Sequence, residues 1–420
     1  MTKQSPTEII TQIAQQAKLA YSELSLSSTE QKNSALEIAA KLILKQQAEI
    51  ISINKTDLKN AAKNAKNQAF IDRLLLDKKR IEAMSNSLLD IINLPDPVGK
   101  ITYQNKRPNG LNIKRITIPL GVIAIIYEAR PNVTSDAFAL CLKSGNAAIL
   151  RPGSESFATS KYILTLLQEA LYQAKLPINS AQILPSTNRN LVNELLNCSD
   201  YIDVIVPRGG KELIKAISSK SKIPIFKHLD GNCHTYIHAD ANLTKAVEIL
   251  YNAKLRRTGI CGATESVVID RQIISNLAPL IEEKFANLCE IRAETQALKY
   301  FKNAIKANNQ DFATEYLSNI FSVKMVNNIN EAVAHINKYS SKHTEAIITE
   351  DSIAAQKFLQ EIDSAIVMHN SSTQFADGGE FGLGAEIGIS TGRMHARGPV
   401  GLEQLVTYKY LVEGSGQIRA

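Results

Sequence analysis

The stretch LGVIAIIYEARPNVTSDAFALCLKSGNAAILRPG, residues 120–153, decides the fold. Two apolar runs, at 120–127 and 146–152, enclose a helix-like segment at 135–145. Continuous apolar runs separated by a helix are typical of parallel strands that are buried on both faces of their sheet. The stretch therefore predicts a strand–helix–strand unit, from which open α/β domains are built.

The same alternation continues toward the C-terminus. Residues 156–173 have the spacing of a helix, and DVIVPRGGKELIKAI at 203–217 has a strand, a turn and a helix in that order. We therefore expect a Rossmann-type, nucleotide-binding domain over 1–227. A second α/β domain, over 228–390, is predicted from three apolar runs that are each followed by helix-like sequence: SVVID, FSVKMV and EAIITED.

The N-terminal region is predicted to be helical from residue 5 to about residue 90, with Ser28 or Thr29 capping one of the helices. Residues 100–119 then alternate polar and apolar side chains around Pro-Asn-Gly, which predicts a β-hairpin inserted in the first domain. The C-terminal segment, 391–420, combines a loop with an alternating stretch that is expected to be a strand.

Composition narrows the class of protein. A chain of 420 residues with 44% hydrophobic content can form two or three packed domains, and a charged fraction of 21% is ordinary for a globular protein. The formal charge of +7 favours anionic ligands, but the basic residues are spread along the chain, which argues against nucleic acid as a partner. Without an apolar stretch of about 18 residues, no membrane span is expected. The polar N-terminus has no apolar signal core, so the cytoplasm is the expected location.

Five scattered cysteines, an odd number, do not make a disulfide framework. Cys261 lies between two glycines, after a helix-like segment that ends in Arg256 and Arg257. Small neighbours leave the sulfur accessible, and the arginines supply positive potential that favours a thiolate. A buried core thiol is the alternative at Cys261. That alternative is preferred for three cysteines in helix-like segments: Cys141, Cys198 and Cys289.

Asn132 follows Pro131 where an apolar strand passes into a loop. Its carboxamide can donate to the oxygen that becomes negative when a sulfur atom adds to a carbonyl group. An asparagine that ends a turn is the alternative.

Four motifs occur in order over nearly the whole chain: YEARPNVT at 127–134, HLDGNCH at 228–234, TGICGAT at 258–264 and EIGISTGRMHARGPVGLEQL at 386–405. TGICGAT resembles the catalytic-cysteine motif of aldehyde dehydrogenases, and the four motifs together resemble the γ-glutamyl phosphate reductase family of that superfamily. The resemblance implies an aldehyde dehydrogenase-like α/β fold, with a Rossmann-type cofactor domain, an α/β catalytic domain and a small β oligomerisation arm. It also implies NADPH-dependent reduction of L-glutamate 5-phosphate to L-glutamate 5-semialdehyde and phosphate, in proline biosynthesis. Cys261 is then the nucleophile, and Asn132 and the Cys261 N–H hold the oxyanion.

His228 stands where hydrolytic aldehyde dehydrogenases have the glutamate of ELGGK, which activates water. The missing carboxylate implies, by the same resemblance, that phosphate and not water is the acyl-group partner. Asp230 stays open as a replacement base, although it is shifted by two residues in an extended segment. No metal site is expected, because the nearby histidines and cysteine lack the usual spacing of paired ligands: His228, Cys233, His234 and His238.

Arg151 follows a buried strand where superfamily members commonly have Lys-Pro-x-Glu, with the carboxylate on the adenosine ribose. An arginine without that carboxylate favours a 2′-phosphate and therefore NADP(H), although Glu155 lies close by and weakens this inference. A glycine pair before a helix allows close approach of a phosphate to the helix N-terminus. The predicted cofactor contacts are Arg151, Ser154, Gly209, Gly210 and, by a loose alignment, Glu315.

A loop bounded by glycines, GISTGRMHARGP, offers several donors for the anionic substrate. Arginine suits both carboxylate and phosphate because its planar fork makes two bonds. Solvated surface arginines are the alternative. The predicted substrate contacts, with Arg393 or Arg397 favoured, are Arg130, Arg256, Arg257, Ser390, Thr391, Arg393, His395 and Arg397.

The hairpin at 100–119 and the tail strand resemble the arms that pair subunits in this superfamily, which implies a homo-oligomer; two internal strands are the alternative. No kinase portion is recognisable, so a separate glutamate 5-kinase, in transient contact, is expected to supply the substrate. Two other functions stay open. One is an acylating aldehyde dehydrogenase that uses CoA or another semialdehyde, and the other is a non-catalytic protein that binds NADP or anions.

Overall fold

The computed structural model describes residues 4–63 and 68–419. The remaining residues, 1–3, 64–67 and 420, belong to the predicted first domain and C-terminal segment and lie outside the described residues. Across the described ranges, no helix combines the length and the apolar character that crossing a membrane requires.

The chain forms two compact units. The first contains the chain up to Lys227, Gly382–Gly388 and the part from Val400 onward; the second contains His228–Phe381 and Ile389–Pro399. The segment that the sequence groups as 391–420 is therefore divided between the units after Pro399.

The helical N-terminal region is confirmed. It comprises α1 (Pro6–Leu24), α2 (Thr29–Lys45), α3 (Gln47–Lys63), α4 (Gln68–Leu74) and α5 (Lys78–Asn93). Ser28 caps α2, because its hydroxyl accepts the Gln31 N–H at 3.3 Å while the Gln31 side chain accepts the Ser28 N–H at 3.2 Å. This exchange satisfies two of the N–H groups that the start of a helix leaves without partners.

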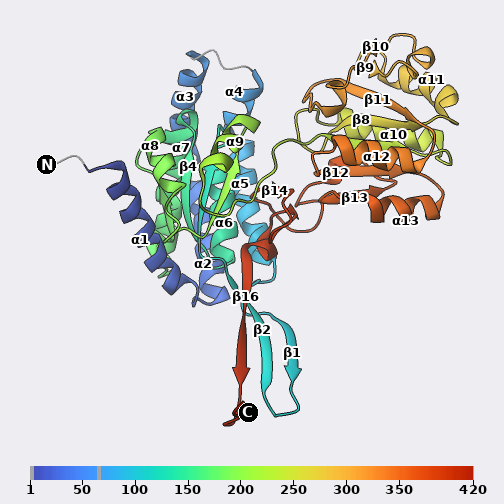
Figure 1. The fold of residues 1–420 in the computed structure, drawn as a ribbon. Helices are drawn as coiled ribbons and strands as arrows, with labels where there is room; N and C mark the ends of the chain where they lie inside the picture. Colours follow the sequence, from blue (N-terminus) through green and yellow to red (C-terminus); the bar gives the residue numbers. More distant parts are fainter. Residues whose placement is uncertain (1–3, 64–67, 420) are drawn as a thin grey trace. The chain divides into compact units, whose positions relative to one another are not determined.

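A four-stranded parallel sheet, in the order β5-β4-β3-β6, forms the centre of the first unit. Its strands are β3 (Val122–Tyr127), β4 (Ala147–Pro152), β5 (Ala181–Ile183) and β6 (Val204–Arg208). Each residue of β3 is buried, as expected for a strand covered on both faces. Figure 1 shows helices on either side of the strands. The connecting helices are α6 (Val133–Lys143), α7 (Phe157–Gln173), α8 (Arg189–Leu195) and α9 (Lys211–Lys220).

A separate antiparallel sheet forms an arm of the first unit (Figure 1). Its order is β1-β2-β16, with β1 at Ile101–Lys106, β2 at Asn112–Pro119 and β16 at Val406–Glu413. The turn between β1 and β2 contains Gly110 at φ 91°, a backbone conformation that glycine adopts without steric cost. Both the predicted hairpin and the predicted tail strand are confirmed.

The second unit has a seven-stranded parallel sheet in the order β10-β9-β11-β8-β7-β12-β13. Its strands are β7 (Cys233–Ile237), β8 (Thr264–Asp270), β9 (Glu290–Ala293), β10 (Ile305–Lys306), β11 (Ile320–Val326), β12 (Thr344–Ile348) and β13 (Ile366–His369). Its main helices are α10 (Leu243–Leu255), α11 (Ile274–Phe285), α12 (Ile329–Tyr339) and α13 (Ser352–Glu361). Of the three runs that predicted strands here, SVVID and FSVKMV lie in β8 and β11, and EAIITED begins in β12 and extends three residues beyond its end.

Candidate active site

Cys261 lies in the turn between α10 and β8, and its side chain is partly exposed. Burial raises the pKa of the Cys141 thiol to about 12 and that of Cys289 to about 11. Burial also raises the thiol pKa of Cys198 and of Cys233. Because the thiolate is the nucleophilic form, these four cysteines are poor nucleophiles at neutral pH. Cys261 is therefore the strongest candidate.

Two of the other cysteines differ from their predicted placement. Cys198 follows the end of α8, and Cys289 lies between α11 and β9, so the prediction that both lie in helices is wrong. Each nevertheless packs, partly buried, against an apolar core cluster. Helix-like apolar spacing in these segments reflects contact with the core and not helical backbone.

The loop that carries Cys261 is fixed at both ends. A fully buried ion pair between Lys254 and Glu265 joins α10, before the loop, to β8, after it. The Gln374 amide donates to two backbone carbonyls at 3.0 Å each, those of Ala253 and Arg257. These contacts restrict the backbone conformations that the Cys261 loop can adopt.

The segment before β7 packs directly on this loop through Gly231. A Cβ atom at Gly231 would lie 2.0 Å from the Cys261 carbonyl oxygen and 2.6 Å from its Cα, which no real side chain tolerates. The Gly231 N–H also donates to the Glu315 carboxylate at 2.8 Å. Glu315, one of the predicted cofactor contacts, therefore lies close to the Cys261 loop.

Replacement of Gly231 by alanine is expected to displace the Cys261 loop, because the clash is with backbone atoms that cannot turn away. We expect a loss of about 1–3 kcal/mol in the free energy of unfolding and a slower reaction of Cys261 with iodoacetamide. Gly259→Ala is the matched control, since a Cβ there meets no atom within 4 Å. Equal unfolding midpoints and labelling rates for the two variants would contradict the expected clash.

Three neighbouring parallel strands bring the Cys261 environment together. In the sheet order, β8, β7 and β12 are adjacent, and Cys261, His228 and His343 each come shortly before one of them. A ring nitrogen of each histidine and the Cys261 sulfur lie within 4.8 Å of one another. The two imidazoles meet edge to face, with ring centroids 5.3 Å apart. Sequence analysis missed His343; its only signal is a histidine immediately before an apolar strand.

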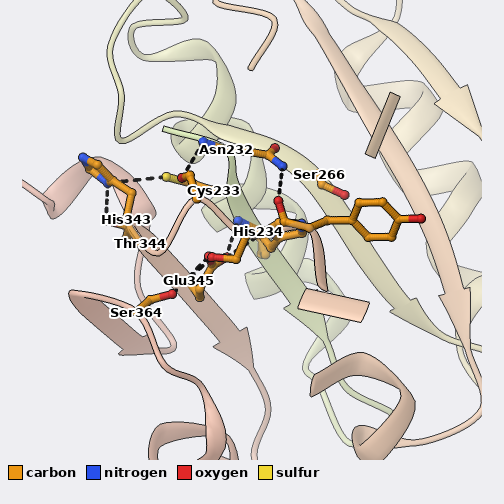
Figure 2. A network of polar contacts seen from close by, with 12 residues as sticks. Asn232, Cys233, His234, Ser266, His343, Thr344, Glu345 and Ser364 are labelled. Atoms are coloured by element: carbon orange, nitrogen blue, oxygen red, sulfur yellow. Dashed lines mark hydrogen bonds and ion pairs between the residues drawn. The ribbon is translucent and has the colours of Figure 1, made fainter. Parts of the chain in front are cut away.

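Cys233 lies beside His343 (Figure 2) and is fully buried. Its thiol donates to the Cys261 carbonyl oxygen at 3.0 Å, and its sulfur lies 3.7 Å from His343 Nδ1. His343 Nδ1 is also 2.8 Å from the Thr344 hydroxyl. A chain of polar contacts therefore connects the Cys261 backbone to the start of β12.

The three histidines considered for metal binding lie along one strand, before, within and just after β7, and have different neighbours. His234 faces away, toward Glu345, whose carboxylate lies 2.9 Å from His234 Nδ1 in a fully buried pair (Figure 2). His238 instead approaches Asp240 and Asp351. The expectation that no metal binds stays a prediction.

Asn132 lies in the first unit, directly before α6. It makes no capping bond; its Nδ2 donates to Asp136 Oδ2 at 2.9 Å. Burial raises the pKa of the Asp136 carboxyl to about 6, opposed by the bond from Asn132 and by Arg208. The amide has a second hydrogen that this bond does not use, so Asn132 can still donate to a substrate oxygen. Nearby Ala129 has φ 38°, a strained conformation of a kind that is found at functional sites.

The predicted cofactor residues of the first unit lie at the carboxyl edge where α/β sheets bind ligands: Arg151 is near the end of β4, Ser154 follows β4, and Gly209 and Gly210 follow β6. Sequence analysis missed Glu128, whose carboxylate accepts the Gly210 N–H at 3.1 Å. A Cβ at Gly209 would lie 2.6 Å from the same carboxylate oxygen, so a side chain there would displace the Glu128 carboxylate. Arg151 donates to the Thr187 carbonyl at 3.2 Å.

Arg151 also interacts with two carboxylates, those of Glu128 and Glu155, although burial lowers its pKa overall. Ser154 donates to Glu155 at 2.9 Å. Negative charge beside Arg151 opposes a 2′-phosphate and suits a ribose 2′-hydroxyl. The preference for NADP(H) therefore stays a prediction.

Most of the predicted substrate contacts belong to the second unit: Arg256, Arg257, Ser390, Thr391, Arg393, His395 and Arg397. Ser390 is buried in β14 (Ile389–Ser390), which pairs with β15 (Gly398–Pro399). Arg393 and Arg397 both bind Asp363, at 2.6 Å and 2.8 Å. These bonds lower the pKa of the Asp363 carboxyl to about 2, so it stays charged. Arg256 donates to Gln374 at 3.3 Å. Arg130, in contrast, belongs to the first unit.

Comparison with known proteins identifies the class. The sequence model of the aldehyde dehydrogenase family matches residues 2–296. An acetylating aldehyde dehydrogenase from Geobacillus thermoglucosidasius has a similar fold, with a TM-score of 0.71 at 16% identity over 99% of this chain and 98% of that one. The chain has the fold of an aldehyde dehydrogenase.

Relatives of higher sequence identity identify the family within this class. The γ-glutamyl phosphate reductase of Brucella suis is 51% identical over 98% of both chains, and that of Erythrobacter litoralis is 50% identical over 99% of this chain and 98% of its own. The crystal structure of the γ-glutamyl phosphate reductase of Thermotoga maritima has a TM-score of 0.96 at 39% identity, covering 98% of this chain and 100% of that one. The chain belongs to the γ-glutamyl phosphate reductase family.

Proposed function

We propose that the protein reduces L-glutamate 5-phosphate to L-glutamate 5-semialdehyde with NADPH and releases phosphate, as a step of proline biosynthesis. The observation that carries the proposal is the Cys261 thiol, partly exposed in an anchored loop, in a chain of this family. Arg256 and Arg257, which directly follow α10, add positive charge for an anionic substrate.

In the proposed reaction the Cys261 thiolate attacks the acyl carbon, the bond from that carbon to the phosphate oxygen breaks, and a thioester forms. Asn132 and the Cys261 N–H stabilise the negative oxygen. NADPH, when bound by the first unit, would supply the hydride that reduces the thioester. The carbon–sulfur bond then breaks, and its electron pair returns to the sulfur as the aldehyde leaves.

The decisive test uses the reverse reaction, in which glutamate 5-semialdehyde reduces NADP. Reduction that requires inorganic phosphate supports the proposal, because phosphate must release the acyl group from the sulfur. Reduction that requires CoA and ignores phosphate would instead identify a CoA-acylating enzyme. Turnover with neither acceptor would indicate a hydrolytic enzyme. Parallel assays with NAD measure the cofactor preference.

We further propose that the β1-β2-β16 arm pairs copies of the chain. Its strands β1 and β16 carry six large exposed apolar side chains: Ile101, Tyr103, Tyr408, Tyr410, Leu411 and Val412. Such a group on an isolated sheet is typical of an association surface. Tyr410→Lys together with Val412→Lys is expected to lower the mass measured by light scattering; an unchanged mass would exclude this role of the arm.

A further inference from the structure

His228 is held in one orientation by a backbone carbonyl. Its Nδ1 lies 3.0 Å from the Ile389 carbonyl oxygen, and because a carbonyl oxygen only accepts, Nδ1 carries a hydrogen and donates it. Nε2 is therefore the ring atom whose lone pair can take a proton. His228 as a residue is half-buried.

The surroundings of His228 keep it beside Cys261. The fully buried His343 ring packs edge-on against the His228 ring at 5.3 Å. Gly231, three residues further along the same loop, contacts the Cys261 backbone and leaves no room for a methyl group. The loop before β7 and the loop before β8 are thus locked together, with the imidazole and the thiol within 4.8 Å.

From this geometry we infer that His228 is a catalytic residue that moves the proton of Cys261; this inference rests on the proposed function. Nε2 takes the proton of the thiol, which leaves a thiolate and an imidazolium. The thiolate displaces phosphate from the acyl carbon, and the imidazolium gives its proton to the departing phosphate, which leaves as a dianion. After hydride transfer and release of the aldehyde, the thiolate regains a proton from solvent through His228.

The protons balance over the catalytic cycle. One proton moves from sulfur to His228 and then to phosphate, and one proton enters from solvent when the thiol is restored. The net reaction consumes acyl phosphate, NADPH and one proton, and it yields aldehyde, NADP and phosphate dianion. Asp230 is not required as a base, because the imidazole performs both transfers.

The experiment measures alkylation of Cys261 by iodoacetamide at pH 7, which needs neither substrate nor NADPH. We expect His228→Ala to slow alkylation by about tenfold or more. Added imidazole should restore the rate, whereas 1,2,4-triazole, which has a similar shape but is a far weaker base, should not. His369→Ala is the control, because His369 is exposed and lies outside this group. Cys261 in this variant should react with iodoacetamide at the wild-type rate, with or without imidazole.

His228→Asn separates a proton-transfer role from a structural one, because its amide can still donate to the Ile389 carbonyl but is not a base. It should be as slow as His228→Ala, with a native unfolding transition. A wild-type alkylation rate in either variant, or equal rescue by triazole, would overturn the inference. A phosphate-independent reverse reaction would overturn the proposed function while leaving the alkylation result intact, so the two failures are distinguishable.

Discussion

Cys261→Ser should abolish the reduction of γ-glutamyl phosphate, lowering kcat by about 10⁴-fold or more. A serine hydroxyl is a much weaker acid than a thiol, so the neighbouring imidazole cannot generate a useful concentration of alkoxide. The backbone of the loop should persist, because its anchors, the Lys254–Glu265 pair and Gln374, do not involve the sulfur. The variant should therefore unfold at the wild-type temperature.

Two measurements complete this prediction. NADPH binding, followed by fluorescence, should be nearly unchanged in Cys261→Ser, which separates lost chemistry from lost structure. Cys198→Ser is the matched control, because Cys198 is also partly buried but lies in the first unit, packed against an apolar cluster. It should retain wild-type kcat. Near-normal turnover by the Cys261 variant would show that another group forms the covalent intermediate.

The layered fold could be predicted because burial leaves a local signature. In β3, six consecutive buried residues appear in the sequence as an unbroken apolar run, and Pro-Asn-Gly marks the hairpin turn directly. Such features depend on residues that are close together in the chain. Sequence reasoning therefore located most strands and helices of both units.

The environment of the thiol could not be predicted in the same way. His343 lies close to Cys261 only because β12 and β8 are both neighbours of β7 in the sheet. The order of strands in a sheet cannot be predicted from local sequence patterns. Glu128 was missed for a related reason, since its contact with Gly210 requires β6 to lie beside β3. Cys233 has only the appearance of a core thiol until its bond to the Cys261 carbonyl is known.

Asn132→Ala should lower kcat by about 10²–10³-fold, equivalent to about 2.7–4 kcal/mol of barrier, while KM changes little. The amide bond to the oxyanion forms only as negative charge develops, so its loss affects the transition state more than the bound substrate. The fold should tolerate the change, because Asn132 makes no helix-capping bond. An unchanged kcat would remove Asn132 from this role.

The protonation of Asp136 provides a second, independent test of the role of the Asn132 amide. Above about pH 6 its carboxylate is ionised and accepts the Asn132 N–H in a charge-assisted bond; below about pH 6 it is protonated, gains an O–H donor and accepts only as a neutral carboxyl group, so the amide is held more weakly. Wild-type kcat should therefore fall as the pH decreases through 6. Asp136→Asn, which cannot ionise, should lower kcat at pH 7.5 and remove that inflection. If the inflection survives in Asp136→Asn, another group causes it, and the orientation of Asn132 does not depend on Asp136.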